Sequence, residues 1–313
     1  MPSFTRMTRV GYKELLLVIS LGLVFWSLPI FADPAPSGFS AELDMNPGAG
    51  TGGYLFVTLR LETGEKLLFM VDTGSPMTLV DKTLAAKLGD RLATIKLRTL
   101  YGTRNSGVYA APKLFLGDRQ LLTGSNVFSC GFTPQSIIAH RRINGILGMD
   151  CLRHYCLQLD FEARKMRMAE PGASAWDHPG AAFPIRFVWG GVPVIDHTGL
   201  VPGKGTNLLI DTGCHIDGFV EKNAINAGCL GWWYWLFGKR LSTCDWGGQT
   251  YSHLLVRRKE NLNLLGLRFL ARHLVTLDFP NRVAYLEKKS TDPIQRGNRR
   301  PASGTNAERP DGR

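Results

Sequence analysis

The sequence has little that would suit a membrane-embedded or disordered protein. Only one segment, near the N-terminus, is apolar enough to span a membrane, so a multi-pass membrane protein is excluded. Charged residues make up only 20% of the chain and hydrophobic residues 44%, which is too apolar for a disordered chain. The 35 Gly and 17 Pro follow no collagen period. The composition is therefore that of a globular protein.

Several catalytic and binding motifs are also missing. The chain has no Gly-x-Ser-x-Gly elbow and no phosphate-loop lysine motif. The glycine-rich segment 48–53 precedes a predicted strand instead of joining a strand to a helix, so it fails as a dinucleotide fingerprint. Cys151 and Cys156 lack the short spacing of a metal knuckle, and His154 adds only a third ligand. We predict no metal and no cofactor.

The positive charge lies largely at the two ends of the chain. The formal net charge is +11, but the N-terminal segment and residues 288–313 contribute a large share of it. The basic runs within the body, 141–142 and 257–259, are short and typical of solvated loops. Because a nucleic-acid binder concentrates basic residues on one folded face, we predict no nucleic-acid partner.

The N-terminus has the pattern of an export signal. Basic residues precede an apolar run over 15–31, and the run ends at Ala32 before a Pro-rich stretch. This pattern predicts a signal peptide over 1–32. A retained membrane anchor is the alternative, and we predict no other membrane contact. The protein is then secreted or periplasmic, and the even number of six cysteines permits disulfides whose pairing the sequence does not decide.

The chain contains one unit twice. Residues 67–75 and 207–214 are both apolar strands that end in Asp-Thr-Gly, and each follows another strand and a glycine turn. A short helical stretch follows each copy, over 81–88 and 221–227, and ends at a glycine 17 residues past its Asp. These matched landmarks predict two homologous lobes.

Later landmarks extend the match. An apolar-apolar-Gly segment at 146–148 corresponds to 264–266, and Leu-Asp-Phe at 159–161 corresponds to 277–279. Most segments between these landmarks are short apolar or alternating runs, which predicts a mainly β architecture. The predicted divisions are a flexible linker over 33–49, an N-terminal lobe over 50–170, an interlobe linker over 171–184, a C-terminal lobe over 185–287 and a disordered basic tail over 288–313.

A pair of Asp-Thr-Gly turns has a chemical use that one turn lacks. If the lobes pack about a pseudo-twofold axis, Asp72 and Asp211 face each other. Two carboxyl groups at close range cannot both ionise cheaply, so one holds a proton. The charged partner can then take a proton from a shared water while the neutral partner donates to a substrate carbonyl.

These motifs resemble those of the aspartic peptidases. The arrangement is similar to the two-lobed pepsin-like enzymes, although each lobe is nearer in size to a retropepsin-like unit, and the resemblance covers residues 50–287. It implies a bilobal fold of two pseudo-twofold-related, β-barrel-like lobes with short helices. It also implies that Asp72 and Asp211 are the catalytic pair, and that the apolar-apolar-Gly segments pass near them.

The resemblance implies supporting roles for the neighbours of the two Asp residues. Thr73 and Thr212 would bond across the lobe interface and hold the loops together, and Gly74 and Gly213 would let backbone N–H groups approach the carboxylates. Ser75 stands where the family often places a hydroxyl donor to its Asp. The second lobe departs from the pattern here, because Cys214 is a weak donor and is better interpreted as a small buried residue.

Two hairpins are candidates for lids over the site. The resemblance implies a flap that carries Tyr101, Gly102 and Thr103 in a hairpin over 97–111, with Gly102 and Gly107 at its tip. An ordinary exposed hairpin is the alternative. A hairpin over 242–255, with Trp246 at its turn, occupies the corresponding place in the second lobe.

Other residues near the site are interpreted as structural. The aromatic run 231–237 packs in a core or lines a substrate pocket, and His215 belongs to a loop. The whole pattern predicts a monomeric aspartic endopeptidase that hydrolyses peptide or protein substrates. The alternative is a non-catalytic module that binds peptides on the same scaffold.

Overall fold

The computed structural model describes most of the chain between residues 38 and 289. The described residues are 38–99, 102–132, 136, 140–173, 176–196, 199–200, 207–221 and 239–289. The predicted signal peptide, the helix over 222–227, the aromatic run 231–237 and most of the predicted tail lie outside them. None of the described helices is long and apolar enough to cross a membrane.

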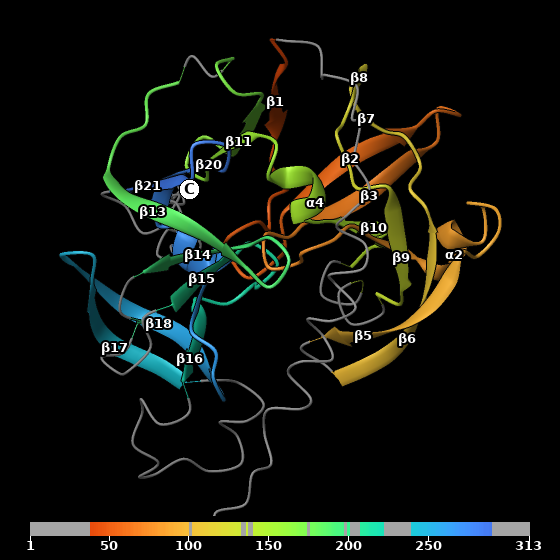
Figure 1. Cartoon of the computed structure of the whole chain (residues 1–313). Coiled ribbons are helices and arrows are strands. Elements are labelled where there is room, and N and C mark those ends of the chain that lie inside the picture. Colours follow the sequence, from red (N-terminus) through yellow and green to blue (C-terminus); the bar gives the residue numbers. More distant parts are fainter. Residues whose placement is uncertain are drawn as a thin grey trace, which may run out of the picture. The chain divides into compact units, whose positions relative to one another are not determined.

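The described residues form a mainly β structure with two sheets, as the sequence predicted (Figure 1). The nine-stranded sheet has the spatial order β5 (Ala93–Thr99), β6 (Gly102–Ala110), β9 (Asn126–Cys130), β4 (Leu79–Asp81), β10 (Gly145–Leu147), β3 (Lys66–Val71), β2 (Phe56–Leu61), β7 (Leu114–Leu116) and β8 (Arg119–Gln120).

The second sheet has twelve strands and draws on both halves of the chain. Its order is β1 (Ser40–Asp44), β12 (Lys165–Ala169), β11 (Cys156–Asp160), β20 (His273–Asp278), β21 (Val283–Lys288), β13 (Ala181–Val188), β14 (Val192–Asp196), β15 (Asn207–Asp211), β19 (Leu264–Gly266), β16 (Gly218–Glu221), β18 (Gln249–Lys259) and β17 (Lys239–Trp246).

The expectation of barrel-like lobes is not met in the described residues. Both sheets are open, with β5 and β8 at the ends of one and β1 and β17 at the ends of the other. The reason lies in β11, which leaves the first half and pairs antiparallel with β20 of the second half over five residues. This pairing joins strands from both halves in one sheet, so the second sheet cannot close on itself within one half.

The strands beside those that lead to the two Asp residues have corresponding neighbours in the two halves. In the first half, β10 runs parallel to β3 and antiparallel to β4. In the second half, β19 runs parallel to β15 and antiparallel to β16. The outer pairings also correspond, because β4 is parallel to β9 and β16 is parallel to β18. β3 also pairs with β2, and β15 with β14, so each Asp-Thr-Gly loop follows a strand that is hydrogen-bonded on both sides.

The helices are short, and one prediction needs a correction of length. α2 covers only Lys82–Ala85, although the sequence predicted a helix to Leu88. The Asp81 side chain caps its start by accepting from the Thr83 N–H, and Gly89 follows with a φ of 84°. The sequence analysis missed α4 (Met149–Leu152) and α6 (Leu267–Leu270), which begin directly after the glycines of the apolar-apolar-Gly segments.

The segment over 33–49, predicted as a flexible linker, contains strand β1. This strand pairs with β12 in full antiparallel register, and Phe39 just before it is 5% exposed. The buried Glu170 carboxylate accepts from the Phe39 N–H at 3.3 Å. Similarly, β13 begins at Ala181, inside the predicted interlobe linker, because it pairs with β21. Local Pro and Gly content indicated loops, but long-range pairing decides both segments.

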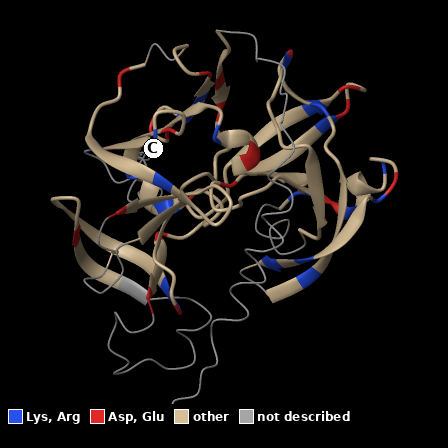
Figure 2. Cartoon of the chain, viewed as in Figure 1, with Lys and Arg blue, Asp and Glu red and all other residues tan. Residues whose placement is uncertain are grey.

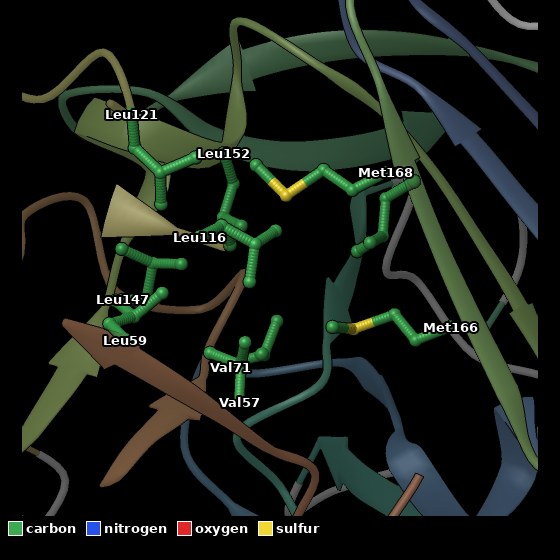
Figure 3. A pocket seen from close by; sticks show the side chains of 10 residues that line it. Val57, Leu59, Val71, Leu116, Leu121, Leu147, Leu152, Met166 and Met168 are labelled. Carbon is green, nitrogen blue, oxygen red and sulfur yellow. The ribbon is translucent and has the colours of Figure 1, made fainter. Parts of the chain in front are cut away.

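The main core is apolar and densely packed. Ten side chains from β2, β3, β7, β10, α4, β11, β12 and the segment after β8 meet in one apolar cluster (Figure 3). The gap between them is too small to admit a water molecule, so this region is core and not a ligand site. Lys, Arg, Asp and Glu are scattered over the strands and loops with their signs mixed (Figure 2).

Candidate active site

Each Asp-Thr-Gly loop begins at the end of a buried strand. β3 is followed directly by Asp72, whose N–H donates to the Leu147 carbonyl at 3.1 Å. β15 ends at Asp211, which lies opposite Gly266 in the parallel pairing with β19. The apolar residues of both strands are buried on the two faces, as expected for strands inside a sheet. The sheets thereby fix the backbone that carries each carboxyl group.

Reciprocal hydrogen bonds between Thr73 and Thr212 hold the two loops together. The Thr73 hydroxyl donates to the Ile210 carbonyl at 2.6 Å, and the Thr212 hydroxyl donates to the Val71 carbonyl at 2.9 Å. Each hydroxyl also accepts from the other threonine's N–H at 3.0 Å. Both threonines are completely buried. Four buried bonds thus connect chain segments about 140 residues apart.

The two carboxyl groups lie against the opposite loop. A Cβ on Gly213 would come within 2.3 Å of the Asp72 carboxyl carbon, and a Cβ on Gly74 within 2.6 Å of that of Asp211. Each carboxylate also accepts from the N–H of the glycine in its own loop at 2.8 Å. Glycine is required at both positions because any side chain would displace the facing carboxyl group.

The environment of the pair raises both of its pKa values. Burial raises the pKa of Asp72 to about 6, although hydrogen bonds from the Gly74 and Ser75 backbone and from Asp211 oppose this effect. The pKa of Asp211 is raised well above its ordinary value by burial and by the charge of Asp72. Because the two groups titrate as a pair, one proton leaves more readily and the other is held more tightly. The larger rise is at Asp211, which favours Asp72 as the charged partner.

The apolar-apolar-Gly segments support the loops from behind. A Cβ on Gly148 would lie 2.4 Å from the Met77 backbone, and one on Gly266 would lie 2.2 Å from the Ile216 carbonyl oxygen. The next residue in each segment donates its N–H to the loop: Met149 to the Ser75 carbonyl at 2.8 Å, and Leu267 to the Cys214 carbonyl at 2.7 Å. Only glycine permits such a close approach of two backbones.

The fourth residues of the loops differ in their roles. The Ser75 hydroxyl donates to the Met77 carbonyl at 2.7 Å and so stabilises its own loop. The contribution of Ser75 to the Asp72 carboxylate comes from its backbone and not from its hydroxyl. This corrects the expectation of a hydroxyl donor to the Asp. Cys214 is 6% exposed, and burial next to Asp211 raises the pKa of its thiol well above the ordinary value. It is a small packed residue, as its sequence context suggested.

The sequence analysis missed a polar layer beneath each loop. In the first half, the buried Thr78 hydroxyl donates to Asp150 at 2.7 Å and accepts from the Gly148 N–H at 3.3 Å. In the second half, the completely buried Asp217 lies 3.4 Å from both Arg268 and Arg272.

A positional signal could have found this layer. Thr78 and Asp217 both stand six residues after the Asp of their loop, and Asp150 and Arg268 both stand two residues after the glycine of the supporting segment. Matching positions in the two halves therefore each hold one polar pair. In the first half the pair is a neutral hydroxyl and a carboxyl group, Thr78 and Asp150, and in the second half it is a carboxylate and a guanidinium group, Asp217 and Arg268.

The candidate flap is a hairpin, but its most informative residue is outside the described residues. β5 and β6 pair from Ala93↔Val108 to Thr99↔Gly102, and Tyr101 lies outside the described residues. Gly102, with a φ of 111°, and Thr103 are exposed at the start of β6. Gly107 lies within β6, opposite Thr94, and not at the tip as predicted, because the two strands remain paired as far as Thr99 and Gly102.

Trp246 does not lie on an exposed lid. β17 and β18 form the predicted second hairpin, and Gly247 and Gly248 supply the positive φ angles of its two-residue turn. Trp246 is only 3% exposed, stacks on Phe183 and meets the edge of Phe269. The aromatic side chain is therefore part of the core, where its burial stabilises the hairpin.

His215, which follows the second loop, packs against Tyr54 of the first half. Its ring meets Tyr54 edge to face with centroids 5.2 Å apart. Burial and the charge of Arg257 lower the pKa of His215. This arrangement agrees with its interpretation as a loop residue.

A mainly β fold with two carboxyl groups brought together on glycine loops is consistent with the aspartic protease fold. Residues 57–151, which include the first Asp-Thr-Gly loop and its supporting segment, match the family described as aspartyl protease. A search of curated proteins found no significant match to the chain. The match supports a protease-type hydrolase at the level of the family.

Proposed function

We propose that the protein is an aspartic endopeptidase in which Asp72 and Asp211 activate one water molecule between them. The observation that carries this proposal is the close packing of each carboxyl group on the glycine of the opposite loop. Corresponding pairings around β3 and β15 support two lobes related by duplication, each of which supplies one Asp. The family match covers the first of these halves.

The unequal protonation of the pair assigns the two roles. Asp72, the partner that ionises near pH 6, accepts a proton from the water as the water attacks the peptide carbonyl carbon. Asp211 retains its proton and donates it to the carbonyl oxygen, which gives a tetrahedral diol. The amide nitrogen then takes the proton held by Asp72 as the C–N bond breaks, and one diol hydroxyl returns its proton to Asp211, which regenerates the pair. Protons are conserved, and neither residue forms a covalent bond to the substrate.

The substrate is an extended peptide or protein segment that lies across the two loops. The exposed end of the β5–β6 hairpin, with Gly102 and Thr103, is suited to cover such a segment and to bond its backbone. We further propose a monomeric protein that acts outside the cytosol, on the basis of the duplicated site in one chain and the N-terminal sequence pattern.

A non-catalytic peptide-binding module is the alternative, and the presence of Cys214 in place of a hydroxyl residue in the second loop permits it. The two candidates make different predictions for the acid pair. A protease needs one carboxylate and one carboxylic acid, whereas a binding module needs only the shape of the site.

The test is cleavage of a mixed peptide library by the purified protein between pH 3 and 8, with new termini detected by mass spectrometry. Asp72→Asn and Asp211→Asn should each abolish cleavage and leave the fold intact, because an amide can neither accept nor supply the proton. Asp118→Asn is the matched control, since that carboxylate is fully exposed, and it should cleave normally. Cleavage by either variant of the pair would rule out the mechanism, and binding without cleavage by the unaltered protein would favour the alternative.

A further inference from the structure

A second cluster of reactive side chains lies away from the acid pair. Cys156, His178 and Asp278 each offer a ligand atom, and these atoms all lie within 4.8 Å of one another. Cys156 is 2% exposed and Asp278 is 6% exposed. The three residues are at least 22 positions apart in the sequence, so no short metal-ligand spacing marks them.

Sheet register brings Cys156 and Asp278 together. Cys156 on β11 lies directly opposite Asp278 on β20 in the antiparallel pairing, so their side chains project from the same face of the sheet. The Asp278 carboxylate is oriented by Asn281, whose N–H and side-chain amide donate to its two oxygens at 3.1 and 2.8 Å. A carboxylate with two oxygens still has lone pairs for another partner.

The third residue comes from the segment between β12 and β13. The Gln158 side chain donates to the Asp177 carbonyl at 3.1 Å and so holds this segment against β11. The ring of His178 stacks on Tyr285 with centroids 5.2 Å apart. Its Nδ1 atom is buried and has no hydrogen-bond partner among the described residues. A buried ring nitrogen without a partner is costly unless a ligand satisfies it.

The donor set and its spacing suit zinc. Sulfur, imidazole nitrogen and carboxylate oxygen are its usual protein ligands at about 2.0–2.3 Å, which puts neighbouring ligands of a tetrahedral site about 3.5 Å apart. The observed spacing is within reach of that value if the side chains close in by about 1 Å. A thiolate and a carboxylate would also neutralise the charge of the ion, which lowers the cost of burying it.

We propose that Cys156, His178 and Asp278 form a zinc-binding site, with a water molecule as the fourth ligand. The site would connect the segment between β12 and β13 to two central strands, one from each half of the chain. Bound zinc would fasten the connection between the halves to the sheet that both halves build. It is separate from the acid pair and does not depend on the proposed peptidase activity.

The test uses the full chain, stripped of metal with a chelator and dialysed. Zinc should bind with a stoichiometry of one by calorimetry and should raise the thermal unfolding temperature. Cobalt in place of zinc should produce the sulfur-to-metal charge-transfer band and the visible bands of a tetrahedral site. Cys156→Ser should abolish the charge-transfer band, and His178→Gln should weaken zinc binding at least about 100-fold, because even changes outside the ligand set cost 10–100-fold.

Two variants control for other thiols and imidazoles. Cys130→Ser and His253→Gln alter residues outside the cluster and should bind zinc like the unaltered protein. Circular dichroism checks that each variant is folded. His178 is less buried than Cys156, so His178→Gln tests the site even if Cys156→Ser fails to fold. Failure of the unaltered chain to bind zinc, or undiminished binding by folded His178→Gln, would overturn the proposal.

Discussion

Replacement of Thr73 by valine is the most direct perturbation of the connection between the two loops. Valine has nearly the same shape but lacks the hydroxyl, which donates to the Ile210 carbonyl at 2.6 Å and accepts from the Thr212 N–H at 3.0 Å. The side chain is completely buried, so water cannot replace the lost bonds without opening the interface. The substitution therefore leaves one buried acceptor and one buried donor without partners.

The magnitude follows from these two groups. Each buried polar group without a partner costs about 1–3 kcal/mol, so Thr73→Val should lower the free energy of unfolding by about 4 kcal/mol. Thr73→Ser keeps the hydroxyl and loses only a methyl group, which should cost about 1 kcal/mol. Thr58→Val changes an exposed residue on β2 and should remain within about 0.5 kcal/mol of the unaltered protein.

Urea unfolding monitored by circular dichroism measures all three variants. A double variant with Thr212→Val should be less destabilised than the sum of the single changes, because both threonines hold the same two loops and the second loss follows a separation already made. The reasoning is refuted if Thr73→Val unfolds like Thr58→Val, or if Thr73→Ser is as unstable as Thr73→Val.

Three further predictions concern the acid pair and its support. Peptide cleavage should increase as the pH rises through about 6, because the raised pKa of Asp72 keeps the pair doubly protonated and without a base below that pH. A cleavage rate that rises instead near the ordinary Asp pKa of about 3.9 would contradict this assignment. Gly213→Ala places a Cβ 2.3 Å from the Asp72 carboxyl carbon and should cost about 2 kcal/mol in urea unfolding and abolish cleavage. Gly131→Ala, with open space around it, is the control and should do neither. Asp217→Asn leaves Arg272 facing a neutral group and should lower the free energy of unfolding by about 3 kcal/mol. An unfolding curve equal to that of the unaltered protein would show that the buried ion pair contributes nothing to stability.

The mainly β fold could be predicted because it depends on local pattern. The strands around 56–61 and 66–71 are short apolar runs on either side of a turn at Gly64, whose φ is 87°. Such a hairpin is defined by neighbouring residues alone. The same reasoning failed for 40–44, because β1 exists only through its pairing with β12, about 125 residues away.

The sequence indicated the two acidic loops and the threonines that join them, but not the polar layer beneath the loops. The repeated Asp-Thr-Gly triplets identified the loops, and their equal spacing to later landmarks indicated a duplicated frame. The hydroxyl of Ser75 and the ring of Trp246 took other roles, because the direction of a side chain depends on packing that sequence distance does not encode.

The sequence by itself determined that two acidic turns end two apolar strands, since strand periodicity, turn glycines and motif spacing are all local properties of the chain. Tertiary structure decided what those turns contact. The reciprocal threonine bonds, the packing of each carboxyl group on the opposite glycine and the meeting of Cys156 with Asp278 all join residues more than 100 positions apart. Such contacts depend on how the strands of both halves align in the sheets, because only that alignment brings distant backbone groups within hydrogen-bond reach.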